Sequence, residues 1–145
     1  MGAPGCQTTL AESVSCAGVG LHGGGWHSLT LAPAAANAGI CFVRADLGGR
    51  VPARLDRVAE ARLGTTLAEA GCRVATVEHV LAALWGMGID NAELVLDGPE
   101  VPALDGSAAP FVQLIRRAGR VSLPQPARTL EVVRPVVVED GARRM

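Results

Sequence analysis

The sequence predicts an α+β domain in which two helices pack on one face of a β-sheet. Short segments of alternating apolar and polar residues predict strands, and two segments with apolar residues three and four positions apart predict helices. These elements follow one another as strands, helix, strand, helix, which is typical of this fold class. Hydrophobic residues make up 49% of the 145 residues and aromatic residues only 3%, so the core is expected to consist of Leu, Val and Ala.

The N-terminal part of the chain predicts a hairpin. Residues 7–16 form the first expected strand, with Leu10 and Val14 on one face. A glycine-rich turn follows over residues 18–25, where several glycines allow positive φ angles. Residues 26–32 then alternate again and provide the second strand.

The middle of the chain predicts three further extended segments. Residues 40–44 form a strand, and residues 51–55 are extended, with Pro52 placing them at a sheet edge. Residues 65–68 and 73–75 flank a short turn and predict a second hairpin.

The first helix begins at Thr76, the predicted N-cap, and ends at Gly86 and Gly88. A strand over residues 92–96 follows it.

The second helix begins at Ser107, which is expected to cap it, with Pro110 tolerated in the first turn. Gly119 ends it. Its apolar stripe consists of Phe111, Leu114, Ile115 and Ala118.

The C-terminal part predicts a domain boundary. Residues 122–128 contain two prolines and are typical of a linker. We expect a first domain over residues 1–123 and a linker over residues 124–128. Residues 129–145 would then be the opening strand of a truncated second domain. That strand, residues 129–139, is rich in β-branched residues. An Asp-Gly turn follows it without a return strand, so we expect the chain to be a fragment.

Composition excludes several functions. The formal net charge of −1 provides no field to attract nucleic acid or anionic lipid. All 13 basic residues are arginine, so no lysine is present for Schiff-base chemistry. The first 25 residues do not resemble a signal peptide and no window resembles an integral membrane segment. The four cysteines form no Cys-x-x-Cys pair, which indicates free thiols and a cytoplasmic protein. They are Cys6, Cys16, Cys41 and Cys72.

Glu78 and His79 are the strongest candidates for chemistry. Both lie in the first turn of the first predicted helix, where the helix dipole favours an ionised carboxylate and a neutral imidazole. One residue could hold a metal ion while the other moves a proton. The alternative is a first-turn carboxylate beside a surface histidine, because the pair lacks the second histidine of the His-Glu-x-x-His motif. His22, in the glycine-rich loop, either faces a ligand or marks a hairpin tip.

Other polar and aromatic residues have simpler structural explanations. The three acidic residues after the strand at 92–96 could form a carboxylate pair, but their Gly and Pro neighbours favour turn formation. His27 is expected on a strand surface, and the two tryptophans are expected in packing or on the surface. The acidic residues are Asp97, Glu100 and Asp105, and the tryptophans are Trp26 and Trp85.

Five segments together resemble the UDP-3-O-acyl-N-acetylglucosamine deacetylase (LpxC) family. They occur in the family's order and at its spacing, within a resemblance that runs from about Thr8 to Gly141. The segments are residues 18–23, 29–34, 73–79, 86–91 and 105–112.

The resemblance implies two similar α+β domains of the ribosomal S5 domain-2-like type, with the active site between them. It implies that His79 binds zinc and that Glu78 is the general base. His22 would lie near the site and contact substrate. Leu63 and Gly64 match a loop close to the metal, where many family members carry cysteine in place of Gly64.

The resemblance further implies Zn²⁺-dependent hydrolysis of the acetamide of a UDP-linked acylated glucosamine, a step of lipid A biosynthesis. The two other zinc ligands, a histidine and an aspartate, and a histidine acid would come from the missing C-terminal domain of the same chain. The fragment alone is therefore expected to be inactive. The open alternatives are a non-catalytic α+β interaction domain and a different metal amidase on the same fold.

Overall fold

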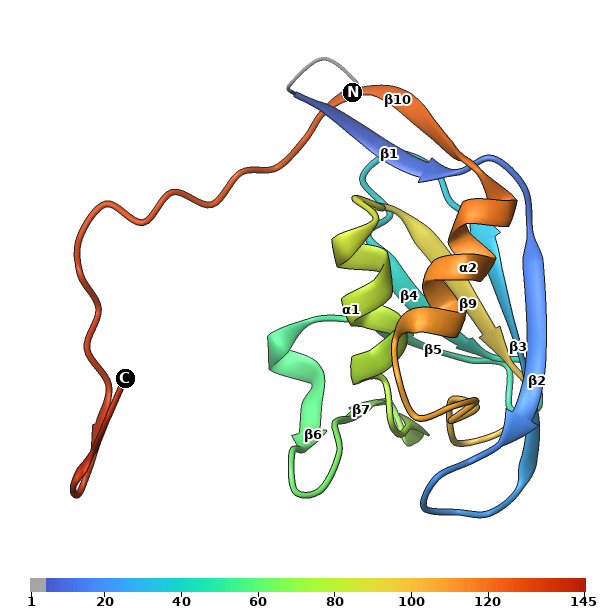
Figure 1. The fold of residues 1–145 in the computed structure, drawn as a ribbon, viewed down its shortest axis with the longest axis horizontal. Helices are drawn as coiled ribbons and strands as arrows, with labels where there is room; N and C mark the ends of the chain where they lie inside the picture. Colours follow the sequence, from blue (N-terminus) through green and yellow to red (C-terminus); the bar gives the residue numbers. More distant parts are fainter. Residues whose placement is uncertain (1–4) are drawn as a thin grey trace.

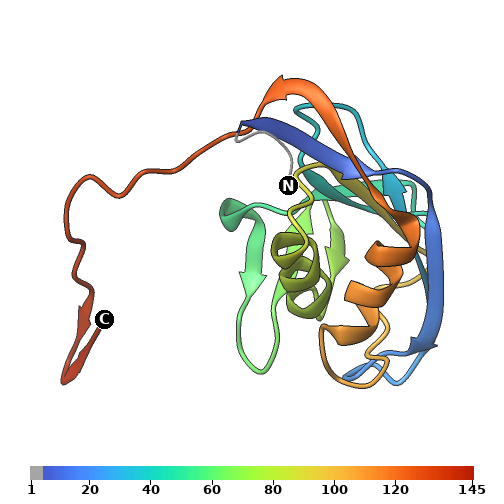
Figure 2. The same cartoon turned by 45° about the horizontal axis from the view of Figure 1, so that its top comes forward.

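The computed structural model describes residues 5–145. A five-stranded sheet carries two helices, α1 (Glu78–Gly86) and α2 (Ala109–Ala118), side by side on one face (Figures 1 and 2). All neighbouring strands are antiparallel except β4 and β9, which are parallel. In spatial order the strands are β2 (Val14–Val19), β3 (Trp26–Pro33), β9 (Ala92–Leu96), β4 (Ile40–Arg44) and β5 (Gly49–Pro52). The predicted α+β fold class is confirmed.

Alternation along the central strands builds the core. Leu29 and Leu31 of β3 are fully buried and pair in register with Leu96 and Leu94 of β9. Phe42 of β4 lies beside Leu94 on the other side. Because successive side chains point to opposite faces, this register brings the leucines onto one face, against the helices. The buried helix residues are Val80, Ala83 and Leu84 of α1 and Phe111, Leu114, Ile115 and Ala118 of α2.

The helices end as predicted but begin differently. The N-cap of α1 is Val77, without a side-chain cap. Thr76 instead has φ 59° and its hydroxyl donates to Glu100 at 2.8 Å, so the predicted Thr76 cap is wrong. The N-cap of α2 is Ala108; Ser107 lies one residue earlier, where its Oγ still accepts the N–H of the first helical residue at 3.1 Å.

The first predicted strand divides into two. The amides of Ala11 and Glu12 donate to carbonyls at the end of α2, which turns the chain between β1 (Cys6–Leu10) and β2. β1 pairs antiparallel with β10 (Arg120–Pro126). Residues 122–126 are therefore a strand and not a linker; a two-stranded pair has free edges at which the missing N–H of proline is tolerated. The domain boundary at 124–128 stays a prediction.

A small three-stranded sheet extends the domain beside β5. It consists of β6 (Val58–Glu60), β7 (Thr66–Glu69) and β8 (Cys72–Val74), and confirms the predicted second hairpin. The expected extended segment 51–55 ends early, since a 3₁₀ turn, η1 (Leu55–Arg57), begins at its last residue.

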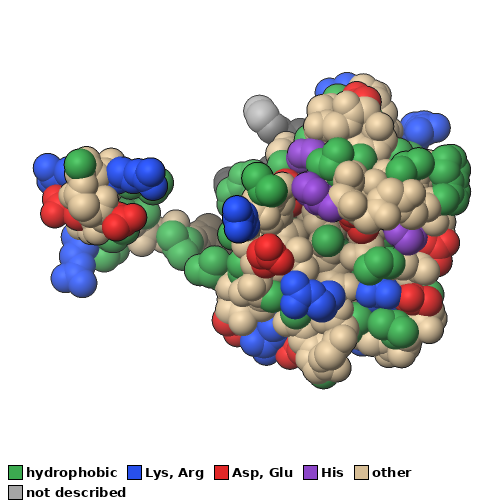
Figure 3. All heavy atoms as spheres, turned by 90° about the horizontal axis from the view of Figure 1, so that it is seen from below, with side chains coloured by type: hydrophobic (Ala, Val, Ile, Leu, Met, Phe, Trp, Pro, Cys, Tyr) green, Lys and Arg blue, Asp and Glu red, His purple; other side chains and the backbone are tan. Residues whose placement is uncertain are grey.

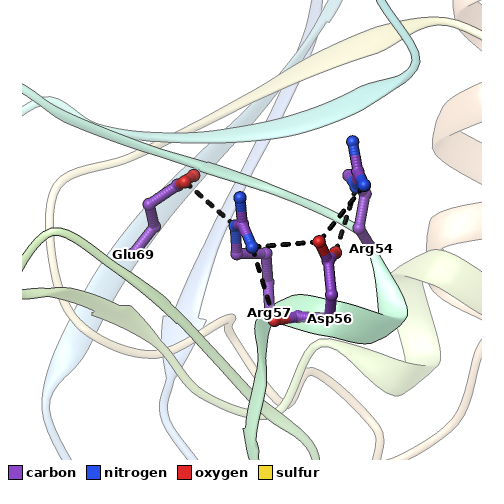
Figure 4. Close-up of polar contacts among 4 residues, drawn as sticks. All are labelled: Arg54, Asp56, Arg57 and Glu69. Carbon is purple, nitrogen blue, oxygen red and sulfur yellow. Dashed lines mark hydrogen bonds and ion pairs between the residues drawn. The ribbon is translucent and has the colours of Figure 1, made fainter.

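Ion pairs secure this extension (Figure 4). Asp56 accepts from Arg54 on one side and from Arg57 on the other, and Arg57 also donates to Glu69 of β7 at 2.9 Å. They tie η1 to the end of β7 and so join the two strands at the base of the β6–β7 hairpin.

The C-terminal segment leaves the domain (Figure 1). Residues 127–138 form no strand, so the predicted strand 129–139 is wrong except for its last residue. The stretch is exposed and Pro135 cannot donate a ladder hydrogen bond. The predicted hairpin does form, with the short return strand that the sequence had not indicated: β11 (Glu139–Asp140) pairs with β12 (Arg143–Arg144). No helix within residues 5–145 has the length and apolarity to cross a bilayer.

Candidate active site

Three segments meet at the lower end of the domain in Figure 1: the β2–β3 loop, the β6–β7 loop and the start of α1. Glu78 is the first residue of α1. Its Oε2 accepts the backbone N–H of Thr65 at 2.9 Å, and the Thr65 carbonyl accepts the N–H of Val77 at 3.3 Å. The β6–β7 loop therefore fixes both the helix start and one carboxylate oxygen.

Gly64 lies between His22 and Glu78. A methyl group added at Gly64 would lie 3.2 Å from Nε2 of His22 and 3.5 Å from Oε1 of Glu78. The imidazole and the second carboxylate oxygen thus approach one point from different loops. A basic nitrogen and a carboxylate that face a shared space can bind a polar group and transfer its proton.

An open cavity of about 270 Å³ lies along this loop. Leu63 has a positive φ of 61° and is 84% exposed, so its apolar side chain forms part of the cavity wall without being packed. Glu78 and His79 are not among the cavity's lining residues. The cavity is lined by His22, Glu60, Arg62, Leu63, Gly64, Thr66, Ala75 and Thr76.

His79 is half-buried and follows Glu78 in the first turn of α1. Figure 3 shows histidine side chains on the face that contains this end of the domain. Residues 5–145 contain no group of three His, Cys, Asp or Glu side chains that could hold a metal ion. A catalytic zinc normally takes three protein ligands, and His79 on its own does not make up such a set.

Glu100, which the sequence singles out only as a turn residue, binds two of the segments that form the site. Its side chain is 3% exposed, and its carboxylate accepts the N–H of His22 at 2.9 Å, the N–H of Gly23 at 2.7 Å and the hydroxyl of Thr76 at 2.8 Å. Burial acts to raise the pKa of Glu100, but these three hydrogen bonds and the nearby His22 outweigh it, and the pKa is lowered.

Comparison with known proteins identifies the family. The model of the UDP-3-O-acyl N-acetylglycosamine deacetylase family matches residues 7–145. The chain belongs to this family.

Relatives from several bacteria support the same assignment, and each is named UDP-3-O-acyl-N-acetylglucosamine deacetylase. The protein from Anaeromyxobacter dehalogenans is 57% identical over 135 residues, which cover 93% of this chain and 44% of that protein. The Geotalea uraniireducens protein is 48% identical, covering 96% and 46%. The Vibrio cholerae protein is 49% identical, covering 93% and 45%. The chain thus spans about half the length of these deacetylases.

The remaining polar candidates of this deacetylase-family chain lie outside the site. Asp97 accepts the N–H and hydroxyl of Ser28 at 2.8 and 2.6 Å, and these bonds lower its pKa. His27 is 3.9 Å from Asp97. Asp105 accepts the N–H and hydroxyl of Ser107 in a turn before α2. The expected turn-forming role of Asp105 is confirmed. For Asp97 and Glu100 it is wrong, because their carboxylates accept from residues of other segments, Ser28 for Asp97 and His22 for Glu100.

The expectations for the two tryptophans and the four cysteines are confirmed. Trp26 and Trp85 are exposed. All four cysteines are free thiols, two exposed or half-buried and two buried.

Proposed function

We propose that the full-length protein is a zinc-dependent hydrolase that removes the acetyl group from UDP-3-O-acyl-N-acetylglucosamine in lipid A biosynthesis. This chain would supply the part of the active site that holds the general base. The observation that carries the proposal is the convergence of Glu78 and His22 across Gly64, in a chain of this family.

Glu78 is suited to act as the base. One carboxylate oxygen accepts the N–H of Thr65, which restrains the orientation of the side chain. The other oxygen faces the space above Gly64. In this position Oε1 would accept the proton of a water molecule as that water attacks the acetamide carbonyl carbon.

His79 would be one ligand of the zinc ion, and the C-terminal half of the protein would contribute the others. A bound zinc ion polarises the carbonyl group and lowers the pKa of a coordinated water molecule to about 7. His79 is half-buried at the start of α1, beside Glu78.

His22, Leu63 and Gly64 would contact the substrate. His22 can donate a hydrogen bond to a polar group of the sugar from its exposed loop. Leu63 offers an apolar contact, and the missing side chain of Gly64 leaves room between the two polar residues. The free thiols favour a cytoplasmic location for the reaction.

The test uses this chain continued through the C-terminal half that its relatives possess. The protein is stripped of metal, zinc is added back stepwise, and acetate release from UDP-3-O-acyl-N-acetylglucosamine is measured. We expect activity to rise with zinc to a plateau near one equivalent. Absence of zinc-dependent acetate release would contradict the proposal and favour an interaction domain, whereas release from other acetamides only would indicate a different amidase.

A further inference from the structure

The buried carboxylate of Glu100 joins two of the segments that form the site. Its Oε1 accepts both the N–H of His22 and the hydroxyl of Thr76, and its Oε2 accepts the N–H of Gly23. His22 reaches the cavity from the β2–β3 loop, and Thr76 lies two residues before Glu78. The Glu100 carboxylate thus binds the loop that carries His22 and a residue just before Glu78. His22 and Glu78 are the two side chains that face Gly64.

The backbone around Glu100 reinforces this link. Ala75 donates to the carbonyl of Pro99 at 2.8 Å, and Val101 donates to the carbonyl of Ala75 at 3.1 Å. Ala103 donates to the carbonyl of Val19 at 2.9 Å. The chain from Pro99 to Ala103 therefore runs between the start of α1 and the end of β2, with the Glu100 side chain between them.

Two backbone features are shaped around this carboxylate. Thr76 is β-branched yet has φ 59°, a conformation that persists only where surrounding contacts enforce it. A methyl group added at Gly20 would overlap the carboxylate, and one added at Gly23 would lie 3.0 Å from Oε2. The loop glycines permit the close approach, and the hydroxyl bond holds Thr76 in its unusual conformation.

We propose that Glu100 is a positioning residue that sets the place of His22 relative to Glu78. The inference rests on the proposed function and assigns Glu100 no contact with substrate. Its bonds reach residues 24 to 78 positions away in the sequence, whereas a turn-forming carboxylate bonds its own neighbours, as Asp105 does with Ser107. Its ionised form, which the lowered pKa favours, can accept from all three donors at once.

The first test measures hydrogen exchange of the backbone in the full-length protein. Glu100→Gln is compared with Asp97→Asn, which removes a carboxylate from bonds outside the site. We expect exchange of the His22 and Gly23 amides to accelerate at least about tenfold in Glu100→Gln only, with core amides of β9 unchanged. Unchanged exchange at His22 and Gly23 would overturn the proposal. Hydrogen exchange is measured without substrate turnover. The positioning role of Glu100 and the proposed deacetylase function are therefore tested independently.

The second test measures kcat and KM on the same substrate. We expect Glu100→Gln to lower kcat at least tenfold, because small misplacements of catalytic groups have large effects on rate, with Asp97→Asn within twofold of the unchanged protein. Equal kcat in both variants would contradict the positioning role.

Substitutions of Thr76 keep the proposal testable if Glu100→Gln does not fold. Thr76→Ser retains the hydroxyl and should retain kcat, whereas Thr76→Val retains the shape, loses the hydroxyl and should lower kcat. Where Glu100→Gln does fold, the loss of kcat in Glu100→Gln/Thr76→Val should be smaller than the product of the two single losses. Equal kcat for the Ser and Val variants, or fully multiplicative losses, would show that Glu100 does not act through Thr76.

Discussion

The carboxylate of Glu78 is held at 2.9 Å by the backbone amide of Thr65, 13 residues earlier in the chain. Because the donor is a backbone group, only a proline at position 65 would remove it. The orientation of Glu78 therefore depends on the path of the β6–β7 loop. At the base of the same hairpin, Arg57 binds both Asp56 and Glu69 (Figure 4).

Glu78→Gln should lower kcat of the full-length protein by roughly 10²–10⁴-fold, the usual contribution of proton-transfer catalysis. The amide keeps the shape of the side chain and removes the base, so zinc content should not change. Steady-state rates and metal analysis check this. Glu12→Gln, an exposed carboxylate on the surface, is the matched control. A kcat near that of the control would remove Glu78 from the mechanism.

His79→Ala should weaken zinc binding by the full-length protein more than about 100-fold, since loss of even an indirect partner of a metal ligand costs 10–100-fold. Residues 1–145 alone should bind zinc weakly, because they supply one of three ligands. Competition with a chromophoric chelator measures both affinities. Tight stoichiometric binding by residues 1–145 that survives the substitution would contradict the assignment.

Gly64→Ala should change kcat/KM by no more than about threefold, because the added methyl lies 3.2 Å from Nε2 of His22 and the imidazole needs to move only slightly. Gly86→Ala, where an added methyl meets nothing within 4 Å, is the control and should leave kcat/KM unchanged. Melting temperatures should stay close for both variants. A loss of tenfold or more would contradict this and show that the site tolerates no side chain at position 64.

The lowered pKa of Glu100 predicts a specific acid sensitivity. Its ordinary value is 4.5, so the stability contributed by the ionised carboxylate is fully present above about pH 4.5 and is lost as the pH falls through the lowered folded-state pKa. In urea unfolding below pH 4.5, the free energy of unfolding should therefore fall more steeply for the unchanged protein than for Glu100→Gln. Other carboxylates titrate in both proteins and cancel in the difference. Parallel pH profiles would refute this linkage.

The C-terminal segment should make residues 1–145 self-associate. Val132, Val133 and Val136 are exposed on an unpaired extended stretch, which is a site for intermolecular strand pairing. Size-exclusion chromatography with light scattering should show oligomers, and a chain ending at Ala127, just after β10, should show fewer. A monomer at all concentrations for the longer chain would contradict the prediction.

The sequence predicts the central strands and both helices because their signals are local. Alternation in β3 and β9 and helical spacing in α2 decide which faces are buried, without reference to distant residues. Pairing of β1 with β10 joins segments more than 100 residues apart, for example Thr9 and Val121, and two prolines in β10 resemble a linker. Local patterns contain no information about such a partner.

The residues of the candidate site also differ in whether a local sequence pattern predicts them. Glu78 and His79 are recognisable because two polar residues open an apolar helix. Leu63 and Gly64 are predicted only through the family resemblance, since the chemistry of a glycine depends on what approaches it. The role of Glu100 is missed because two of its partners, His22 and Gly23, lie 78 and 77 positions away.

The pairing of β1 with β10 also brings strands from the two ends of the domain side by side (Figure 2). The chain enters and leaves the domain through adjacent strands, so a further unit can be appended at this seam without threading through the core. The same pairing makes the domain suitable for circular permutation: joining residues 6 and 126 by a short linker and opening the exposed turn at residues 46–48 would preserve every strand pair of the five-stranded sheet.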